Sequence, residues 1–414
     1  MKRYICLLLV FLIVLSFAAC VKEPVQEPSG NTTQSNIPQD TTLHPDSTQD
    51  TTDTAVHAVQ LPMCAVFMPL VTEEVTASDG TVVFRTTYQD ISLTLQNTDC
   101  ADSIILDLLR RIDLSNKSDL EILNWAISDY TGQEGWIPYF SEILYSPVRM
   151  DEKVLSFYGS HMSYGGGVHP NINCTSVSYD LASGRSLTMA DILVDQAAAD
   201  TLCDMIIEKL VSIDEEYSLY PGYERTVNER YGTVFDTTWE PTDAWFLSDA
   251  GLGIYFSPYD LAPYAMGAIE LVFSYDDLGG ILKEDFFPAS LPESVPGTVE
   301  AILAQDIDLD NFSQFGEAIL EEDGEHVVLY TNGLVENLTL ELGQWDSDGI
   351  SFFPTATVFA ADTLTPGDAV LLYTMFADVM PHLRLRYTSG GTEYRFFLTQ
   401  SGKDGSIILL EDLT

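Results

Sequence analysis

The chain has 414 residues, of which 46% are apolar, and its formal net charge is −45 at pH 7. This length predicts two or three domains, and this apolar fraction can fill their cores. Nucleic acid is excluded as a partner class, because phosphate binding needs clustered Lys and Arg and the chain has 18 of these against 63 Asp and Glu. The acidity favours cationic partners, or it serves solubility alone.

The N-terminus has the pattern of an export signal. MKR precedes the apolar run YICLLLVFLIVLSF, which is shorter than the roughly 20 residues of a membrane span, and Ala-Ala-Cys follows, ending at Cys20. This ending resembles the lipobox of bacterial lipoproteins, although Phe17 stands where that box usually carries Leu. We predict a lipoprotein signal peptide over 1–19, cleaved before a lipidated, palmitate-bearing Cys20. A plain secretory signal or an uncleaved anchor is the alternative.

The segment after the lipidation site is rich in Thr, Pro, Gln, Ser and Asp and has almost no large apolar residue. Such a segment cannot bury enough surface to offset its chain entropy, so 20–60 is predicted to be a disordered tether. A lipid, a tether and a globular body indicate a membrane-anchored, extracellular protein of the cell envelope, facing outside the cytoplasm.

The first part of the body is predicted to combine strands and helices. Residues 62–71 and 81–95 show the alternation of strands, and Asp79-Gly80 lies between them. Apolar residues at helical spacing predict two helices, at 101–112 and 118–130.

The next part continues the mixed pattern. It contains a tight turn at Ser183-Gly184 and a short helix led by Thr188. The remaining predicted elements are a strand region at 143–163, a helix at 197–213, and strands at 251–257 and 268–274. Strands and helices in clusters rather than strict alternation predict an α+β fold, a two-part mixed domain at 62–160 and 161–286.

A proline-marked join, FFPASLPESVPG, occupies 286–297, and the segment after it is mostly β. Its strands are separated by turn dipeptides at Asn332-Gly333, Asp348-Gly349, Gly390-Gly391 and Asp404-Gly405. This spacing predicts an immunoglobulin-like β-sandwich domain at 298–414.

No familiar catalytic, nucleotide-binding or zinc motif occurs in the chain, and we expect no cofactor. One acidic stretch, DIDLDNFSQFGE, has carboxylates at positions 1, 3, 5 and 12 of a calcium loop, namely Asp306, Asp308, Asp310 and Glu317. Asn311 stands where that loop requires Gly, so chance in an acidic chain explains the match better. The body's four cysteines, Cys64, Cys100, Cys174 and Cys203, could form two disulfides or remain free thiols.

Three segments carry a family resemblance: YGGGVHPN (164–171), YDLASGRSLTMADIL (179–193) and YFSPYDLAPYAMGAIELVFSYDDL (255–278). In this order and spacing they resemble the bacterial family called domain of unknown function 3298, over 161–286. The part at 62–160 is similar to its usual N-terminal companion, domain of unknown function 4163. Relatives include the extracellular domain of a lysozyme-binding anti-sigma factor and a domain attached to a peptidoglycan deacetylase.

The resemblance implies a cell-envelope binding or sensing module without the effector part of those relatives. Only MKR precedes the apolar run, so we expect no cytoplasmic sigma-binding domain, and no deacetylase domain follows residue 286. We expect a monomer that is not an enzyme and that binds a cell-wall glycan or a cationic protein such as lysozyme. The alternative is an envelope hydrolase acting on peptidoglycan or acetylated sugars.

The glycine run at 165–167 places a sharp corner before His169, which Pro170 holds extended. We interpret His169 mainly as a structural residue whose ring bonds neighbouring backbone, with ligand contact as the alternative. The candidate ligand-binding residues are Tyr164, His169, Asn171, Tyr259 and Tyr264.

Overall fold

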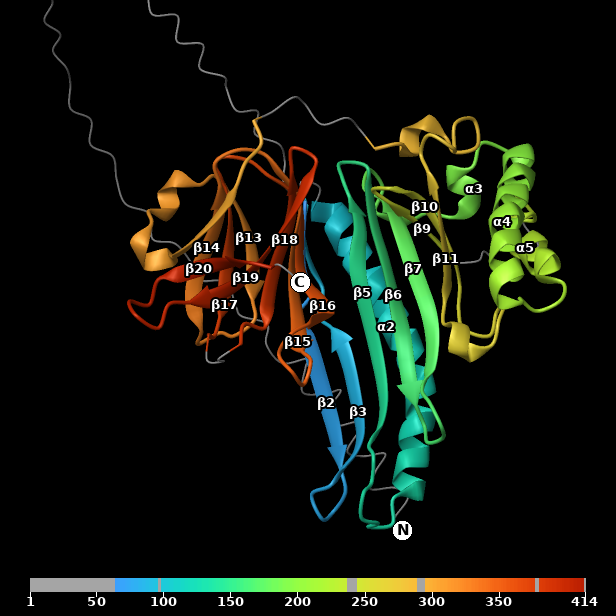
Figure 1. Cartoon of the computed structure of the whole chain (residues 1–414), viewed down its shortest axis with the longest axis horizontal. Coiled ribbons are helices and arrows are strands. Elements are labelled where there is room, and N and C mark those ends of the chain that lie inside the picture. The colour runs from blue at the N-terminus through green and yellow to red at the C-terminus, as the bar shows by residue number, and fades with distance from the viewer. Residues whose placement is uncertain (1–63, 96–97, 237–243, 289–294, 377–379, 413–414) are drawn as a thin grey trace, which may run out of the picture. The chain divides into compact units, whose positions relative to one another are not determined.

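The structure is a computed structural model that describes residues 64–95, 98–236, 244–288, 295–376 and 380–412. The signal peptide, Cys20 and the tether lie outside these residues. The described residues form several β-sheets and also α-helices that are not in strict alternation with the strands, so the α+β prediction is confirmed (Figure 1).

A six-stranded sheet of order β2-β3-β5-β6-β7-β8 forms the frame of the first part. Its strands are β2 (Leu70–Thr76), β3 (Val82–Gln89), β5 (Tyr139–Met150), β6 (Val154–Tyr164), β7 (Asn171–Asp180) and β8 (Arg185–Ser186). The turn predicted at Asp79-Gly80 joins β2 to β3, and Gly80 takes the positive φ of 87° that glycine tolerates.

Helix α2 (Thr98–Asp129) packs on this sheet, against β3, β5 and β6. The prediction of two helices, at 101–112 and 118–130, was wrong, because one continuous helix spans both segments. The intervening residues, DLSNK, contain neither Pro nor Gly, so no residue forces the backbone out of the helix.

The strand region predicted at 143–163 is a hairpin of β5 and β6 rather than one strand. Asp151 makes the turn, because its Oδ1 accepts hydrogen bonds from the backbone N–H groups of Lys153 and Val154, both at 2.8 Å. Aspartate favours turns through such bonds to the backbone just after it.

A three-stranded sheet, β11-β10-β9, carries the helices of the second part. Its elements are α3 (Met189–Ile192), α4 (Gln196–Tyr217), α5 (Tyr223–Tyr231), β9 (Trp245–Ser248), β10 (Gly251–Phe256), η1 (Tyr264–Met266), β11 (Ile269–Ser274) and η2 (Glu284–Phe286). The predicted start at Thr188 is confirmed by a capping box, in which Thr188 and Asp191 each bond the other's backbone N–H.

The C-terminal part contains two sheets that face each other across an apolar core. The four-stranded sheet has the order β12-β14-β17-β13, with β12 (Val299–Leu303), β13 (Gln314–Ile319), β14 (Glu325–Thr331) and β17 (Asp368–Thr374). The seven-stranded sheet has the order β20-β19-β18-β15-β16-β1-β4, and five of its strands are β15 (Val335–Trp345), β16 (Phe352–Leu364), β18 (Leu383–Ser389), β19 (Thr392–Gln400) and β20 (Ile407–Glu411). Two short 3₁₀ turns, η3 (Ala304–Asp306) and η4 (Leu309–Asn311), precede β13.

The last two strands of the seven-stranded sheet come from the start of the body. They are β1 (Ala65–Phe67), which pairs with β16, and β4 (Ser92–Thr94), which pairs with β1. The predicted strands at 62–71 and 81–95 are therefore each divided between two sheets. Strand β1 has two buried faces: Ala65 packs in the sandwich core, whereas Val66 lies in the core that contains α2.

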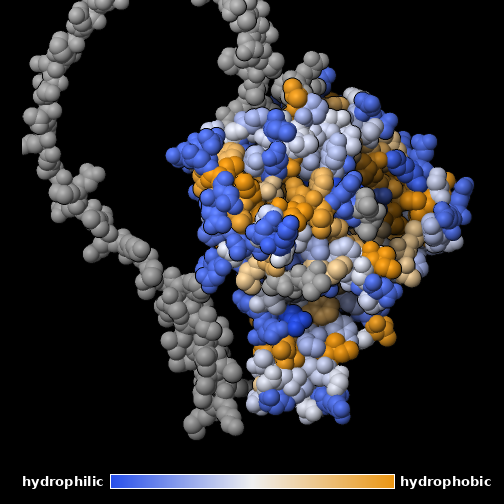
Figure 2. Space-filling model, turned by 60° about the vertical axis from the view of Figure 1, so that its left-hand side comes forward, coloured by the Kyte–Doolittle hydropathy of each residue, from blue (hydrophilic) through white to orange (hydrophobic). Residues whose placement is uncertain are grey.

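The face of the molecule that Figure 2 shows is mostly hydrophilic, with apolar patches among the hydrophilic residues. On the sandwich the exposed apolar side chains include Ile319, Phe353 and Leu410. Within the described residues, no helix is long and apolar enough to cross a membrane. Among the described residues, the four cysteines of the body are not joined by disulfide bonds.

Candidate functional site: an aromatic cluster at His169

The corner before His169 needs its glycines. A Cβ on Gly165 would lie 2.8 Å from the ring of Trp125, and one on Gly166 would lie 2.3 Å from the Tyr139 hydroxyl. Gly166 and Gly167 also have positive φ values of 86° and 129°. The glycines therefore let the chain turn between β6 and β7 while it passes closely over aromatic side chains.

The turn presents the His169 ring to two tyrosines from another loop. The ring stacks on Tyr264, with centroids 3.8 Å apart and planes at 16°, and its Nε2 lies 3.3 Å from the Tyr259 hydroxyl. Its Nδ1 lies 2.8 Å from the carbonyl oxygen of Pro170. Because a carbonyl only accepts, Nδ1 carries the proton there, and Nε2 accepts from Tyr259 in the neutral ring.

Tyr259 is held in an unusual backbone conformation. Its φ is +75°, in a turn in which the Asp260 N–H donates to the Ser257 carbonyl at 3.0 Å. Pro258 occupies the preceding position, so the turn has the residue order of a type II turn with Tyr where Gly is usual. Such a conformation persists only where its surroundings enforce it, and it is frequent at binding sites.

A partly buried ion pair fixes this turn. The Arg230 guanidinium lies 2.9 Å from Asp260 Oδ2, and the same carboxylate accepts from the Ser257 N–H at 2.8 Å. The Ser257 hydroxyl in turn accepts from the Cys174 N–H on β7 at 2.9 Å. Tyr259 is therefore displayed from a braced loop, and 54% of its surface is exposed.

Of the five predicted ligand-binding residues, the structure brings His169, Tyr259 and Tyr264 together. Tyr164 instead packs against Tyr139, at a centroid distance of 5.6 Å, and its hydroxyl donates to the Gly167 carbonyl at 3.1 Å. Asn171 begins β7 opposite Ser163, exposed to solvent. Tyr164 thus supports the corner, and we call His169, Tyr259 and Tyr264 the aromatic cluster.

The weak calcium candidates are not gathered into a loop. Asp308 caps η4 by accepting the Asp310 N–H at 3.1 Å, whereas Glu317 lies in strand β13. Among the residues that the structure describes, no three His, Cys, Asp or Glu side chains lie close enough to hold a metal ion. Asp306 therefore belongs to no such group either.

Sequence reasoning missed a set of three polar side chains that lie close together between α2 and the sheet. His161 Nε2 lies 2.9 Å from Ser141 Oγ and 3.5 Å from Asp119 Oδ1. Both contacts involve the same ring nitrogen, whereas a catalytic triad uses one nitrogen for each partner. The signal in the sequence was weak, because Asp119 lay at the start of a predicted helix, where Asp is common.

A thiol also lies beside the aromatic cluster's loop. Burial raises the pKa of Cys174, which keeps the thiol protonated, and a reactive cysteine needs the opposite shift. The neighbouring Tyr158 donates a hydrogen bond to Glu270. This bond joins β6 to β11.

Comparison with known proteins identifies the segment that carries the two tyrosines. Residues 190–276 match the family described as "Protein of unknown function (DUF3298)". This segment is a DUF3298 domain. It contains α4, α5 and β9 to β11, and it supplies Tyr259 and Tyr264, whereas His169 lies before it.

Two crystal structures of DUF3298 family members are similar to this chain. One is from Bacteroides fragilis, with 19% identity and a TM-score of 0.38, and the match covers 53% of this chain and 94% of that one. The other is from Pseudomonas aeruginosa PAO1, with 15% identity and a TM-score of 0.38, covering 54% of this chain and 97% of that one. No curated protein matches the chain.

Proposed function

We propose that this protein is a non-enzymatic, lipid-anchored binding or sensing protein of the cell envelope. The observation that supports this function is the aromatic cluster: three rings from two loops, one stacked pair at 3.8 Å, and an exposed tyrosine held at positive φ. We further propose that Cys20 carries the lipid and that 62–160 is a domain of unknown function 4163.

The cluster suits two classes of ligand. Aromatic faces bury large apolar area with a polar tip, which fits the C–H faces and hydroxyl groups of a wall glycan. They also attract cations, so Lys or Arg of a protein such as lysozyme would be drawn both to the rings and to the acidic chain.

Binding tests distinguish the two ligands. The full-length protein would be titrated with soluble peptidoglycan fragments and, separately, with lysozyme. Tyr264→Ala should weaken binding about threefold to tenfold, because it removes a ring face that contacts the ligand, and such a contact contributes roughly 0.5–1.5 kcal/mol. Lysozyme binding should also lose on-rate as salt rises, whereas glycan binding should not.

The matched control is Tyr394→Ala, which removes an exposed tyrosine that likewise stacks on a ring, Tyr387, in the sandwich. Equal losses for Tyr264→Ala and Tyr394→Ala, or none for either, would exclude the cluster as the binding surface. Turnover of peptidoglycan or acetylated sugars by the wild type that His169→Ala abolishes would instead support the hydrolase.

The anchor has its own test. Metabolic labelling with a palmitate analogue should mark the wild type and not Cys20→Ala, since the thiol is the acceptor. Labelling that survives this substitution would contradict the lipoprotein assignment, whatever the cluster binds.

A further inference from the structure

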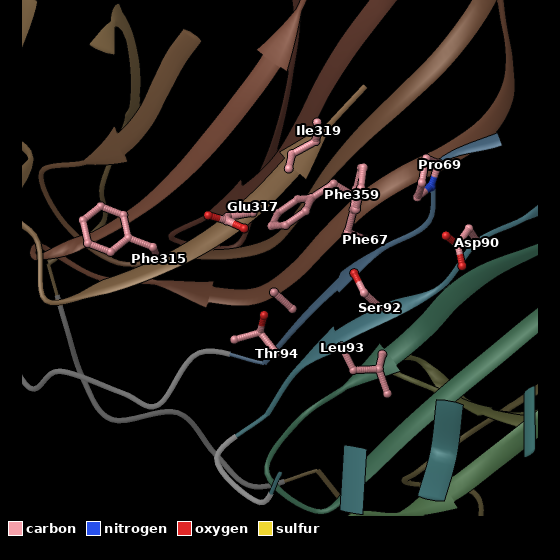
Figure 3. Close-up of a pocket in the computed structure, with 11 residues that line it drawn as sticks. Phe67, Pro69, Asp90, Ser92, Leu93, Thr94, Phe315, Glu317, Ile319 and Phe359 are labelled. Atoms are coloured by element: carbon pink, nitrogen blue, oxygen red, sulfur yellow. The ribbon is translucent and has the colours of Figure 1, made fainter. Parts of the chain in front are cut away.

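A groove of about 470 Å³ lies between the edges of the two sandwich sheets. Figure 3 shows Phe315, Glu317 and Ile319 of β13 on one side, Ser92 and Thr94 of β4 on the other, and Phe67 and Phe359 between them. The remaining lining residues are Ala65, Pro69, Asp90 and Leu93.

The groove exists because the two sheets differ in width. The four-stranded sheet ends at β13, and the seven-stranded sheet extends to β4. Strand β13 lies close to β1 and β16 of the larger sheet. Strand β4 is one strand further out than β1, so no described strand of the smaller sheet faces it. A fifth strand beside β13 would complete the smaller sheet and cover this floor.

The outer edge of β13 offers backbone groups for such a strand. The Leu320 N–H donates to the Tyr373 carbonyl at 2.9 Å, on the β17 side. Because backbone groups alternate in direction along a strand, those of Phe315, Glu317 and Ile319 face away from β17. Within the described parts of the chain, no strand pairs with that edge.

The lining residues of the groove favour an occupant that is partly apolar and positively charged. Phe67, Leu93 and Phe359 give an apolar floor, and Glu317 and Asp90 are exposed carboxylates. No Lys, Arg or His is among the groove's lining residues. An occupant with alternating apolar and basic side chains matches both features, since successive side chains of a strand point to opposite faces.

We propose that this groove binds an extended, cationic segment of a partner protein, which adds as a fifth strand to β13. Six residues of β13 span about 20 Å, enough to pair with five or six residues of the segment. Backbone pairing gives affinity, and the apolar floor and the two carboxylates select the sequence. The groove is separate from the aromatic cluster, so either proposal can fail without the other.

The chain's own N-terminal segment is a less suitable occupant. Residues 21–63 contain one Lys, no Arg and several Asp and Glu, so their charge is repelled by Glu317 and Asp90.

The probe is a fluorescein-labelled peptide of eight residues in which valine and lysine alternate, measured by fluorescence anisotropy on the full-length protein. We expect saturable binding that the same peptide with glutamate in place of lysine does not show. N-methylation of one valine amide and of the lysine amide next to it should weaken binding at least about fivefold, because successive amides of a strand point to opposite sides and one of the two must therefore pair with β13.

Two substitutions separate backbone pairing from charge. Ile319→Pro removes a backbone N–H that points away from β17, so it breaks no hydrogen bond between β13 and β17. This substitution should weaken peptide binding at least about fivefold, whereas Ile319→Val should not. Glu317→Gln should weaken binding about twofold to fivefold, as expected for an exposed ion pair, and its control is the exposed Glu325→Gln on β14.

Equal affinity for the plain and N-methylated peptides would overturn the proposal, and this comparison holds even if Ile319→Pro alters folding. Equal affinity for the lysine and glutamate peptides would also overturn it. Peptide binding seen only after removal of the residues before Val56 would show that the chain's own segment occupies the groove. That result would overturn the proposal that the occupant is a partner protein.

Discussion

Two regions of this protein are built from very different stretches of sequence. The core around the DUF3298 domain, with Leu202, Ile206 and Leu252 at its centre, comes almost entirely from residues 187–282. The sandwich core combines residues 299–398 with Ala65 of β1, and the core on the other face of β1 joins Val66 to Ala360.

The difference concerns what each region needs from the rest of the chain. The helices α4 and α5 bury their apolar faces on strands close to them in sequence. The seven-stranded sheet needs β1 as its sixth strand and needs Asp362, whose Oδ1 accepts the Cys64 N–H at 2.9 Å. We therefore expect the DUF3298 domain to withstand changes in β1 that unfold the sandwich.

The largest effect should come from Val66→Asp. Val66 is fully buried in β1, so an unpaired carboxylate there should destabilise the protein by more than about 4 kcal/mol. Hydrogen exchange should rise in β15, β16 and β5 and much less in α4 and β10. The control is Val75→Asp on β2, where the side chain is exposed. Equal exchange in both regions would show that they unfold as one unit.

A cut in the proline-marked join tests the same contact. A specific protease site would be inserted between Pro288 and Val295. After cleavage the two fragments should still co-elute in gel filtration, because β1 belongs to the first fragment and β16 to the second. Fragments that carry Val66→Asp should separate. Separation of the wild-type fragments would mean that β1 contributes little, and that 298–414 behaves as an independent domain.

The pH dependence of stability should involve Asp362. Burial raises its pKa to about 7 in the folded protein. Between about pH 4 and 7 the folded protein keeps a proton that the unfolded chain has released, so the free energy of unfolding falls as pH rises through this range. Each unit by which the folded pKa exceeds the unfolded value is worth roughly 1.4 kcal/mol.

Urea unfolding at pH 5 and pH 8 should therefore show a smaller difference for Asp362→Asn than for the wild type. The whole acidic chain shifts stability in the same direction, and so does Asp249, whose pKa burial raises to about 6. The exposed Asp348→Asn controls for the loss of one charge. Identical pH slopes in the two variants would refute a special role for Asp362.

The smallest effect is expected within the DUF3298 region. Thr188→Ala removes the hydroxyl that accepts the Asp191 N–H at the start of α3, and it should destabilise the protein by about 1 kcal/mol. Thr201→Ala, an exposed change inside α4, serves as a control for the loss of a threonine. An effect of Thr188→Ala no larger than this control would show that the cap is dispensable.

Several local features followed directly from the sequence. Thr188 and the glycine turns at residues 80, 184 and 391 were predicted correctly, because each depends on side chains or backbone freedom within a few residues. The single helix α2 was missed, since the polar residues between its halves looked like a break although none of them ends a helix.

The aromatic cluster was predicted only as a set of candidates. His169 and Tyr259 are 90 residues apart, and no periodicity relates a loop after β6 to a loop after β10. The positive φ of Tyr259 was also hidden, because Tyr occupies a turn position where Gly is usual.

The sequence by itself determined the charge, the α+β class, the turns and the helix cap, because these depend on composition and on neighbours along the chain. Only the tertiary structure decided that β1 joins the C-terminal sheet, that His169 stacks on Tyr264, and that β13 ends the smaller sheet. The physical reason is that a strand's backbone can pair with any other strand. The choice of partner depends on which pairing buries both faces, and that depends on residues hundreds of positions away.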